Sequence, residues 1–280
     1  MEKNLPLVLT IDFGTQSLRT ALINKAGEIE AIVKRKYDPV YISVEKGYAE
    51  QDPDFYFDNL IAALKELASK NKDKLDRIKG STISTFRDTS VQLDKDLKPV
   101  RRSILWLDQR LAKAEEKLPF GYNGLFTLVG MKDTIKLNRS RTMAHWIKEN
   151  EPDVWNKTDK YVNISTYLTY KLTGKLEDSC ANLTGHYPIN FKKREWWGEK
   201  ALKGVIFGIP KRMLFPLKQP GEVIGEFTDE ICEKTGLPKG IKLFASGSDK
   251  ACETLGLGAL SKEIGAVSYG TASTIEVLTS

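Results

Sequence analysis

The stretch LVLTIDFGTQS, residues 7–17, decides how the chain can fold. Its first five residues are apolar and rich in β-formers, and they stop at Asp12, so they predict a buried strand that ends in a tight turn. Gly14 allows the backbone to approach a phosphate, and the hydroxyls of Thr15 and Ser17 can donate to phosphate oxygens. Asp12 could hold Mg²⁺ through water, because magnesium keeps much of its hydration shell. Taken alone, the motif fits a polar hairpin turn equally well.

The elements expected around this stretch follow the order three strands, helix, strand. Asp52 before Pro53 predicts the start of the helix, because Asp is a favoured N-cap and Pro a favoured first residue. This α/β order is typical of the ribonuclease H-like layer of actin, hexokinase and the Hsp70 ATPase. Strands are expected at 7–11, 17–23, 28–36, 78–84, 90–93, 98–105, 242–245, 266–269 and 274–278, and helices at 53–71, 110–117, 139–150, 164–172 and 250–257.

Two later segments carry related chemistry. Gly270-Thr271 again stands between two strand patterns, and a second phosphate-type turn is what an ATPase clamp of the actin kind requires. Asp249 stands where a strand ends and a helix begins, a position that exposes a carboxylate in a cleft. Such a carboxylate can accept the proton of a hydroxyl during phosphoryl transfer. From this segment alone, Asp249 as the N-cap of the following helix is the more ordinary interpretation.

The composition is that of an ordinary globular protein, with 41% hydrophobic and 29% charged residues. The formal charge of +6 suits an anionic ligand such as a nucleotide, but solvated lysines explain it as well. Apolar runs are too short for a transmembrane helix, and no signal-peptide core precedes the first strand. Three widely spaced cysteines and two histidines fit neither a disulfide framework nor a zinc site. We therefore expect a cytoplasmic protein that binds neither nucleic acid nor membrane.

Four motifs in order resemble the FGGY family of carbohydrate kinases. IDFGTQSLRTALIN (11–24) is similar to the first phosphate motif of that family, and STFRDTSVQLDKDLKPVRRSILWLDQR (84–110) to its sugar-contacting stretch. ASGSDKACETLGLGAL (245–260) resembles the segment with the catalytic aspartate, and VSYGTAS (267–273) the second phosphate motif. The resemblance implies a ribonuclease H-like domain with a mixed sheet and helical insertions. It also implies an enzyme that uses ATP and Mg²⁺ to phosphorylate a hydroxyl of a sugar, sugar acid or polyol. A homodimer is compatible with the resemblance, but the sequence does not decide the oligomeric state.

The same resemblance implies roles for single residues. Asp249 would be the general base for the substrate hydroxyl. Arg87 and Asp88 match a pair that holds polyol hydroxyls, because a guanidinium beside a carboxylate offers both donors and acceptors. A local ion pair between these two is the alternative, and Lys250 could contact an acidic substrate or point to solvent. The other implied positions are Asp108 and Arg110 for the substrate, Asp12 for magnesium, and Gly14, Thr15, Gln16, Ser17, Gly270 and Thr271 for the phosphates.

Two positions depart from the pattern of the family. Lys250 stands where relatives tend to carry Gln or Asn, and Met143 stands where a lysine normally precedes Trp146 by three residues. Residues 1–262 are expected to form the substrate-binding N-terminal domain, and 263–280 the first strands of an ATP-binding C-terminal domain. The FGGY signature and the adenine-binding motif would lie beyond them, so the chain alone is not expected to be active.

Two alternatives keep the fold but change the function. One is an actin-like ATPase, which would not need Arg87 and Asp88 in a cleft or a base directed at an acceptor hydroxyl. The other is a non-catalytic protein that responds to a sugar, although such a protein has no reason to keep both Asp12 and Asp249.

Overall fold

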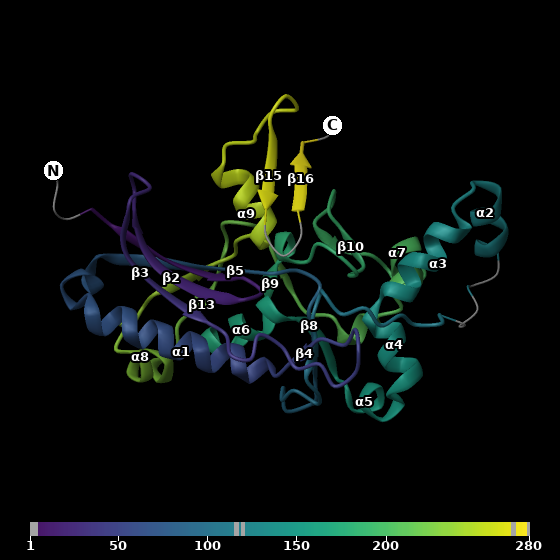
Figure 1. Ribbon diagram of the computed structural model, residues 1–280, viewed down its shortest axis with the longest axis horizontal. Helices are drawn as coiled ribbons and strands as arrows, with labels where there is room; N and C mark the ends of the chain where they lie inside the picture. Colours follow the sequence, from purple (N-terminus) through teal and green to yellow (C-terminus); the bar gives the residue numbers. More distant parts are fainter. Residues whose placement is uncertain (1–4, 115–117, 119–120, 270–272, 279–280) are drawn as a thin grey trace.

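A six-stranded mixed sheet forms one half of the molecule, on the left in Figure 1. The structure is a computed structural model that describes residues 5–114, 118, 121–269 and 273–278. Across the sheet the strands are β13 (Val223–Glu226), β14 (Lys242–Phe244), β5 (Ile78–Thr85), β1 (Leu7–Phe13), β2 (Ser17–Asn24) and β3 (Ile29–Lys36). β1, β2 and β3 are antiparallel neighbours, whereas β5 pairs in parallel with both β1 and β14. β13 completes the sheet antiparallel to β14.

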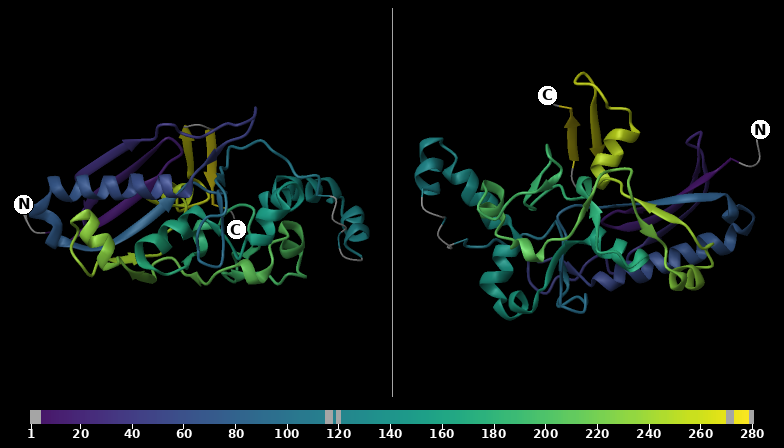
Figure 2. Two further views of the ribbon diagram at one scale, coloured as in Figure 1. Left: turned by 90° about the horizontal axis from the view of Figure 1, so that it is seen from below. Right: turned by 180° about the vertical axis from the view of Figure 1, so that it is seen from behind.

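Helix α1 (Pro53–Lys70) lies along one face of this sheet (Figure 2). It begins where the sequence predicts, because the Asp52 carboxylate accepts a hydrogen bond from the backbone N of Asp54 at 2.9 Å. Its apolar side contacts β2 and β3, and α8 (Asp229–Thr235) packs beside it. The buried side chains of α1 include Tyr56, Phe57, Leu60, Ala63, Leu64 and Leu67.

A smaller sheet and most of the helices lie at the end of the molecule away from β3 (Figure 1). α6 (Ile164–Thr173) contacts β5, β13 and β8, so it joins the two sheets. The smaller sheet has the order β4 (Glu50–Gln51), β7 (Ser103–Ile104), β6 (Ser90–Leu93) and β8 (Lys160–Asn163). The helices are α2 (Tyr122–Leu128), α3 (Lys132–Arg141), α4 (Met143–Asn150), α5 (Pro152–Lys157) and α7 (Leu202–Phe207). Shorter elements are η1 (Lys72–Arg77), η2 (Cys180–Asn182), η3 (Lys211–Met213), β9 (Asp178–Ser179), β10 (Ile189–Asn190), β11 (Glu195–Trp196) and β12 (Leu217–Lys218).

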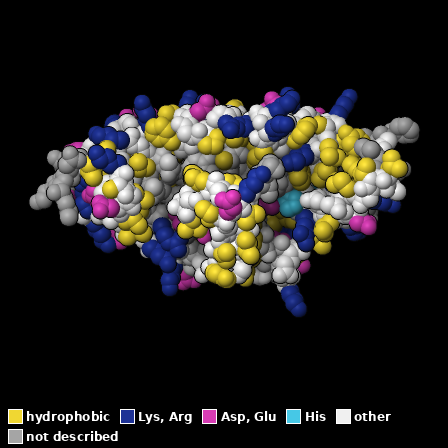
Figure 3. All heavy atoms as spheres, turned by 90° about the horizontal axis from the view of Figure 1, so that it is seen from above, with side chains coloured by type: hydrophobic (Ala, Val, Ile, Leu, Met, Phe, Trp, Pro, Cys, Tyr) yellow, Lys and Arg dark blue, Asp and Glu magenta, His cyan; other side chains and the backbone are white. Residues whose placement is uncertain are grey.

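The last described elements project from this body. They are α9 (Asp249–Gly256) and the antiparallel hairpin of β15 (Gly265–Tyr269) and β16 (Ser273–Val277). Figure 3 looks down on the projection, where hydrophobic side chains gather. Tyr269 is 86% exposed and Ile275 is 74% exposed.

The predicted α/β architecture with a mixed sheet and helical insertions is confirmed, but the helix expected at 110–117 is wrong over its described part. The amide of Ala112 donates to the Ser140 carbonyl at 2.7 Å, and the next two amides each donate to the Glu149 carboxylate at 2.8 Å. The Ala114 amide would donate to the Arg110 carbonyl in such a helix, but it binds Glu149 instead, and the φ of +53° at Ala114 is not helical. Residues 115–117 lie outside the described residues.

Two other expected elements are shorter than predicted. Of 98–105, only β7 is a strand, because the Asp94 carboxylate accepts hydrogen bonds from the amides that follow it in a turn. The helix expected at 139–150 is divided between α3 and α4, since Thr142 has an extended backbone with ψ of 114°. In the described part of the chain, no helix is both long and apolar enough to span a membrane.

Leu64→Ala is expected to lower the free energy of unfolding by about 2–5 kcal/mol, because Leu64 is fully buried in the core beneath the sheet. Urea unfolding followed by circular dichroism measures this change. The control is Lys65→Ala at the exposed neighbouring position, which should change stability by no more than about 0.5 kcal/mol. Equal losses of unfolding free energy in the two variants would show that α1 does not bury the side that carries Leu64 against the sheet.

Candidate active site

The parallel strands β1, β5 and β14 bring three separate segments to one edge of the sheet. Phe13 pairs with Thr85, and the amide of Phe86 donates to the Phe13 carbonyl at 3.0 Å, so the two strands end side by side. β14 lies on the other side of β5 and runs in the same direction, and its last residue, Phe244, is opposite Thr82. In open α/β sheets, ligands bind outside the carboxyl ends of such strands. The turn after β1, the segment after β5 and the loop before α9 therefore meet at the place where a ligand is expected.

The turn after β1 is tied to its surroundings at three points. The Gly14 amide donates to the Ser17 carbonyl at 3.0 Å, and Arg19 Nη1 lies 2.9 Å from Asp12 Oδ2. Thr15 Oγ1 accepts a hydrogen bond from the indole Nε1 of Trp106 at 3.0 Å. The Asp12 carboxylate keeps a second oxygen for another partner, and its side chain is about half exposed at 43%. Gln16 is exposed, whereas Ser17 is buried.

Asp249 is the first residue of α9, but it does not cap that helix. The N-cap is Ser248, whose side chain accepts a hydrogen bond from the backbone N of Ala251. The Asp249 carboxylate accepts from the Lys250 amide at 2.8 Å through Oδ1 alone. The N-cap interpretation of Asp249 is therefore wrong, and its second carboxylate oxygen is available to a ligand.

Burial raises the pKa of the Asp249 carboxyl above its usual range. The hydrogen bond from the Lys250 amide and the charges of Arg87 and Lys250 lower this pKa, while the charge of Asp12 raises it. The charges of Asp12 and Arg87, which come from two other segments of the chain, thus act on the Asp249 carboxyl. In the described part of the chain, the Arg87 guanidinium makes no hydrogen bond or ion pair.

The loop that carries Asp249 is held by a buried polar network. Ser179 donates its hydroxyl to the Ser246 carbonyl, and the Ser248 amide donates to the Ala181 carbonyl at 3.2 Å. Asp178 is fully buried and fixes this part of the chain by accepting four hydrogen bonds. Its donors are Ser165 Oγ at 2.5 Å, Thr166 Oγ1 at 2.7 Å, the Ser179 amide at 2.7 Å and Asn182 Nδ2 at 2.8 Å. Nothing in the local sequence pattern pointed to Asp178.

Asp88 turns away from Arg87 and binds His186. Its φ of +55° places it in the left-handed region, so the two neighbouring side chains take different directions. Asp88 accepts a hydrogen bond from the His186 amide at 2.8 Å, and its other oxygen lies 2.7 Å from His186 Nδ1. The ion pair between Arg87 and Asp88 that the sequence left open is absent from the described residues. His186 was not predicted as a partner of Asp88, because it stands 98 residues further along the chain.

Asp108 and Arg110 bind each other and are almost completely buried. Their side chains are 1% and 2% exposed, and Arg110 Nη2 lies 2.8 Å from Asp108 Oδ2. Asp108 also accepts from the Ala49 amide at 2.6 Å. The Arg110 guanidinium lies over the rings of Tyr48 and Trp146, at 3.8 and 4.5 Å from their centroids. These contacts fix the backbone that carries Trp106.

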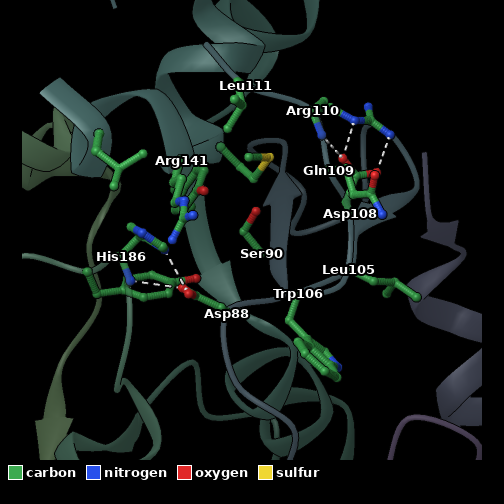
Figure 4. A pocket seen from close by; sticks show the side chains of 14 residues that line it. Asp88, Ser90, Leu105, Trp106, Asp108, Gln109, Arg110, Leu111, Arg141 and His186 are labelled. Carbon is green, nitrogen blue, oxygen red and sulfur yellow. Dashed lines mark hydrogen bonds and ion pairs between the residues drawn. The ribbon is translucent and has the colours of Figure 1, made fainter. Parts of the chain in front are cut away.

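A cavity of about 490 Å³ opens between the segment after β5 and the helices α3 and α4 (Figure 4). This volume lies within the usual range of small-molecule sites, about 300–1,000 Å³. Trp106, Tyr161 and Tyr187 contribute aromatic walls. The other lining residues are Asp88, Ser90, Leu105, Asp108, Gln109, Arg110, Leu111, Leu137, Arg141, Met143 and His186. Trp106 therefore joins the cavity to the turn after β1, a connection that the sequence did not reveal.

The remaining candidate residues lie elsewhere. Lys250 Nζ binds Glu253 Oε2 at 2.6 Å and Ser268 Oγ at 2.5 Å, so its ammonium ties α9 to β15. It does not line the cavity. Gly270 and Thr271, predicted to cradle a phosphate, lie outside the described residues.

Residues 7–256 match the model of the FGGY family of carbohydrate kinases, N-terminal domain. The chain is similar to xylulose kinase of Bacillus subtilis, with 28% identity over 268 residues that make up 96% of this chain and 52% of that protein. It is similar to glycerol kinase of Thermococcus kodakarensis, with 26% identity over 100% of this chain and 54% of that protein. The chain thus spans about half the length of the curated relatives it matches.

Solved structures show the same fold. Gluconate kinase from Lactobacillus acidophilus matches with a TM-score of 0.79 and 24% identity over 97% of this chain and 54% of that chain. Plasmodium falciparum glycerol kinase with ADP matches with a TM-score of 0.76 and 20% identity, also over 97% of this chain and 54% of that chain. The predicted ribonuclease H-like fold is thereby confirmed.

Gly185→Ala is expected to destabilise the protein by about 1–3 kcal/mol more than Gly221→Ala. Both glycines have positive φ, +135° and +89°, so both substitutions strain the backbone. At residue 221 the new Cβ would meet no neighbour, but at residue 185 it would lie 2.3 Å from an oxygen of Asp88. Asp88 would have to move and would lose its contact with His186. Urea unfolding of both variants measures the difference, and equal losses would contradict a close packing of Gly185 on Asp88.

Proposed function

The chain belongs to the FGGY family of carbohydrate kinases, and we propose that the protein containing it transfers the γ-phosphoryl group of ATP to a hydroxyl of a sugar, sugar acid or polyol. The observation that carries this proposal is the Asp249 carboxylate, which Ser248 leaves free by capping α9 in its place. We place it beside the turn after β1, whose amide and hydroxyl groups would donate to phosphate oxygens. A base beside a phosphate site is the arrangement that hydroxyl phosphorylation requires.

We place the acceptor in the cavity beside Asp88 and Trp106. The carboxylate of Asp88 and the ring of His186 offer acceptors and donors to several hydroxyls, and the indole face of Trp106 can cover the carbon side of a sugar. Arg87, directly before Asp88 and without a partner among the described residues, would bind the hydroxyl nearest to Asp249. Asp108 and Arg110 act in this proposal through the backbone that they fix, because their own side chains are buried.

The proposed reaction is a single displacement at the γ-phosphorus of ATP. The acceptor oxygen forms a bond to the γ-phosphorus, the bond from that phosphorus to the β,γ-bridging oxygen breaks, and ADP leaves with the bonding electrons. The hydroxyl proton passes to the Asp249 carboxylate. The raised pKa of Asp249 strengthens it as a base, and positioning of the two substrates supplies most of the remaining catalysis.

In this proposal the turn after β1 binds the phosphates of ATP through Gly14, Thr15, Gln16 and Ser17. Gly270 and Thr271 bind the same phosphates from the second turn. The residues present fit a magnesium ion bound mainly through water, because Asp12 offers one free carboxylate oxygen near Asp249. When bound, such an ion neutralises charge on the transferring phosphate.

We further propose that residues 1–262 form the acceptor-binding domain and that 263–280 begin the ATP-binding domain. The contacts of Lys250 with Ser268 and of Thr254 with Glu276 join α9 to the hairpin. In this proposal the contact of Lys250 with Ser268 takes the place of the contact with the substrate that was expected for Lys250. Closure of the cleft between the two domains would expel water and limit ATP hydrolysis.

Asp249→Asn is expected to lower acceptor-stimulated ADP release by about 10²–10⁴-fold, because the amide cannot accept the hydroxyl proton. The measurement uses the full-length protein and a panel of polyols, ketoses, aldoses and sugar acids. Asp229→Asn is a matched control, since Asp229 also begins a helix directly after its N-cap, Thr228, but its own side chain is exposed. If ATP were hydrolysed equally by all three proteins with no response to any acceptor, the actin-like ATPase would become the better explanation.

The value of kcat/KM is expected to fall as the pH decreases through the pKa of Asp249, because a general base must be deprotonated. Burial raises this pKa, so the acid limb should lie above the ordinary value for aspartate, about 3.9. Rates measured between about pH 4 and 8 locate the limb. An acid limb at or below the ordinary value would contradict a buried carboxylate as the base.

A further inference from the structure

Arg141 differs from every other charged residue that lines the cavity. Asp88 is bound to His186, and Asp108 to Arg110. Arg141 has no hydrogen bond, ion pair or ring contact within the residues that the structure describes. The cavity therefore contains two pairs of polar side chains that bind each other and one guanidinium with no such partner among the described residues.

The position of Arg141 directs this charge into the cavity. It is the last residue of α3, and Figure 4 shows its side chain pointing from the helix toward His186 and Asp88. The nearby wall formed by Leu111, Leu137 and Met143 is apolar and offers it no acceptor. A basic residue at the end of a helix also interacts favourably with the last carbonyl groups. That interaction does not require the side chain to enter the cavity, so it does not account for the orientation.

We propose that the acceptor carries an anionic group, a carboxylate or a phosphate, and that Arg141 binds this group at the end of the cavity away from Asp249. This inference rests on the proposed kinase function and goes beyond it by naming the acceptor as an anionic carbohydrate. A guanidinium binds either group through two parallel charge-assisted hydrogen bonds. Lys250, the cation that the sequence offered for an acidic substrate, is engaged by Glu253 and Ser268, so it does not compete for this role.

The arrangement gives each end of the acceptor a separate function. The hydroxyls near Asp88 and Trp106 would set the orientation, and the anionic group at Arg141 would fix how far the molecule extends toward Asp249. A neutral polyol would leave Arg141 without a protein or ligand partner. The selection between neutral and anionic acceptors therefore depends on one side chain that takes no part in the chemistry.

The test compares acceptors in three arms with the full-length protein: aldonic and uronic acids, sugar monophosphates, and neutral ketoses and polyols. We expect an acid or a monophosphate to be phosphorylated with the highest kcat/KM, and the two anionic arms identify the group. Arg141→Gln should then raise KM for that acceptor about tenfold or more while kcat changes less, because a charge-assisted contact is lost. Arg141→Lys should recover part of the affinity.

Lys136→Gln is the matched control, because Lys136 is an exposed cation on the same helix that does not line the cavity. It should leave KM unchanged. Efficient turnover of neutral acceptors alone, or an unchanged KM for an anionic acceptor in Arg141→Gln, would overturn this inference and leave the kinase function in place. If no acceptor of any arm stimulates ADP release, the proposed function itself fails, and the inference fails with it.

Discussion

The parallel pairing of β5 with β1 on one side and β14 on the other is the constraint on which the site depends. It brings the ends of three strands from distant parts of the sequence to one edge, with Phe13 opposite Thr85 and Leu243 opposite Ser81. Glycine at position 80 allows β14 to approach, because a Cβ there would lie 2.6 Å from the ring of Phe244. Parallel strands need long connections, and here those connections contain the smaller sheet and the helices that surround the cavity.

Most polar groups at the site are held in place before any ligand binds. Ser248 caps α9 and so releases the Asp249 carboxylate, while the network around Asp178 holds the preceding loop through Ser179. Asp108 and Arg110 fix the segment that carries Trp106 in the same way. Groups that are already oriented require less reorganisation when charge develops during a reaction. Among the described residues, the groups that remain unpaired include Arg87, Arg141 and one oxygen each of Asp12 and Asp249. In the proposed function a substrate would supply their missing partners.

The sequence predicted those parts of the structure that depend on neighbouring residues. Asp12 was identified because it directly follows a strand pattern, Asp249 because it stands between a strand pattern and a helix pattern, and α1 because Asp52 and Pro53 mark its start. The pair of Asp88 and His186 could not be predicted, because it spans 98 residues and the rest of the fold brings its members together. For the same reason, the partners of Lys250 and the distant acceptors of the amides after residue 111 do not appear in any local pattern.

The hydrogen bond between the Trp106 indole and the Thr15 hydroxyl joins two regions that would bind different molecules. A ligand that orders Trp106 in the cavity also restricts the turn after β1, and a ligand on that turn restricts Trp106. The two binding events are then thermodynamically linked, and linkage is reciprocal, so each ligand must change the affinity for the other by the same factor. In such a protein the affinity measured for one ligand depends on whether the other is already bound.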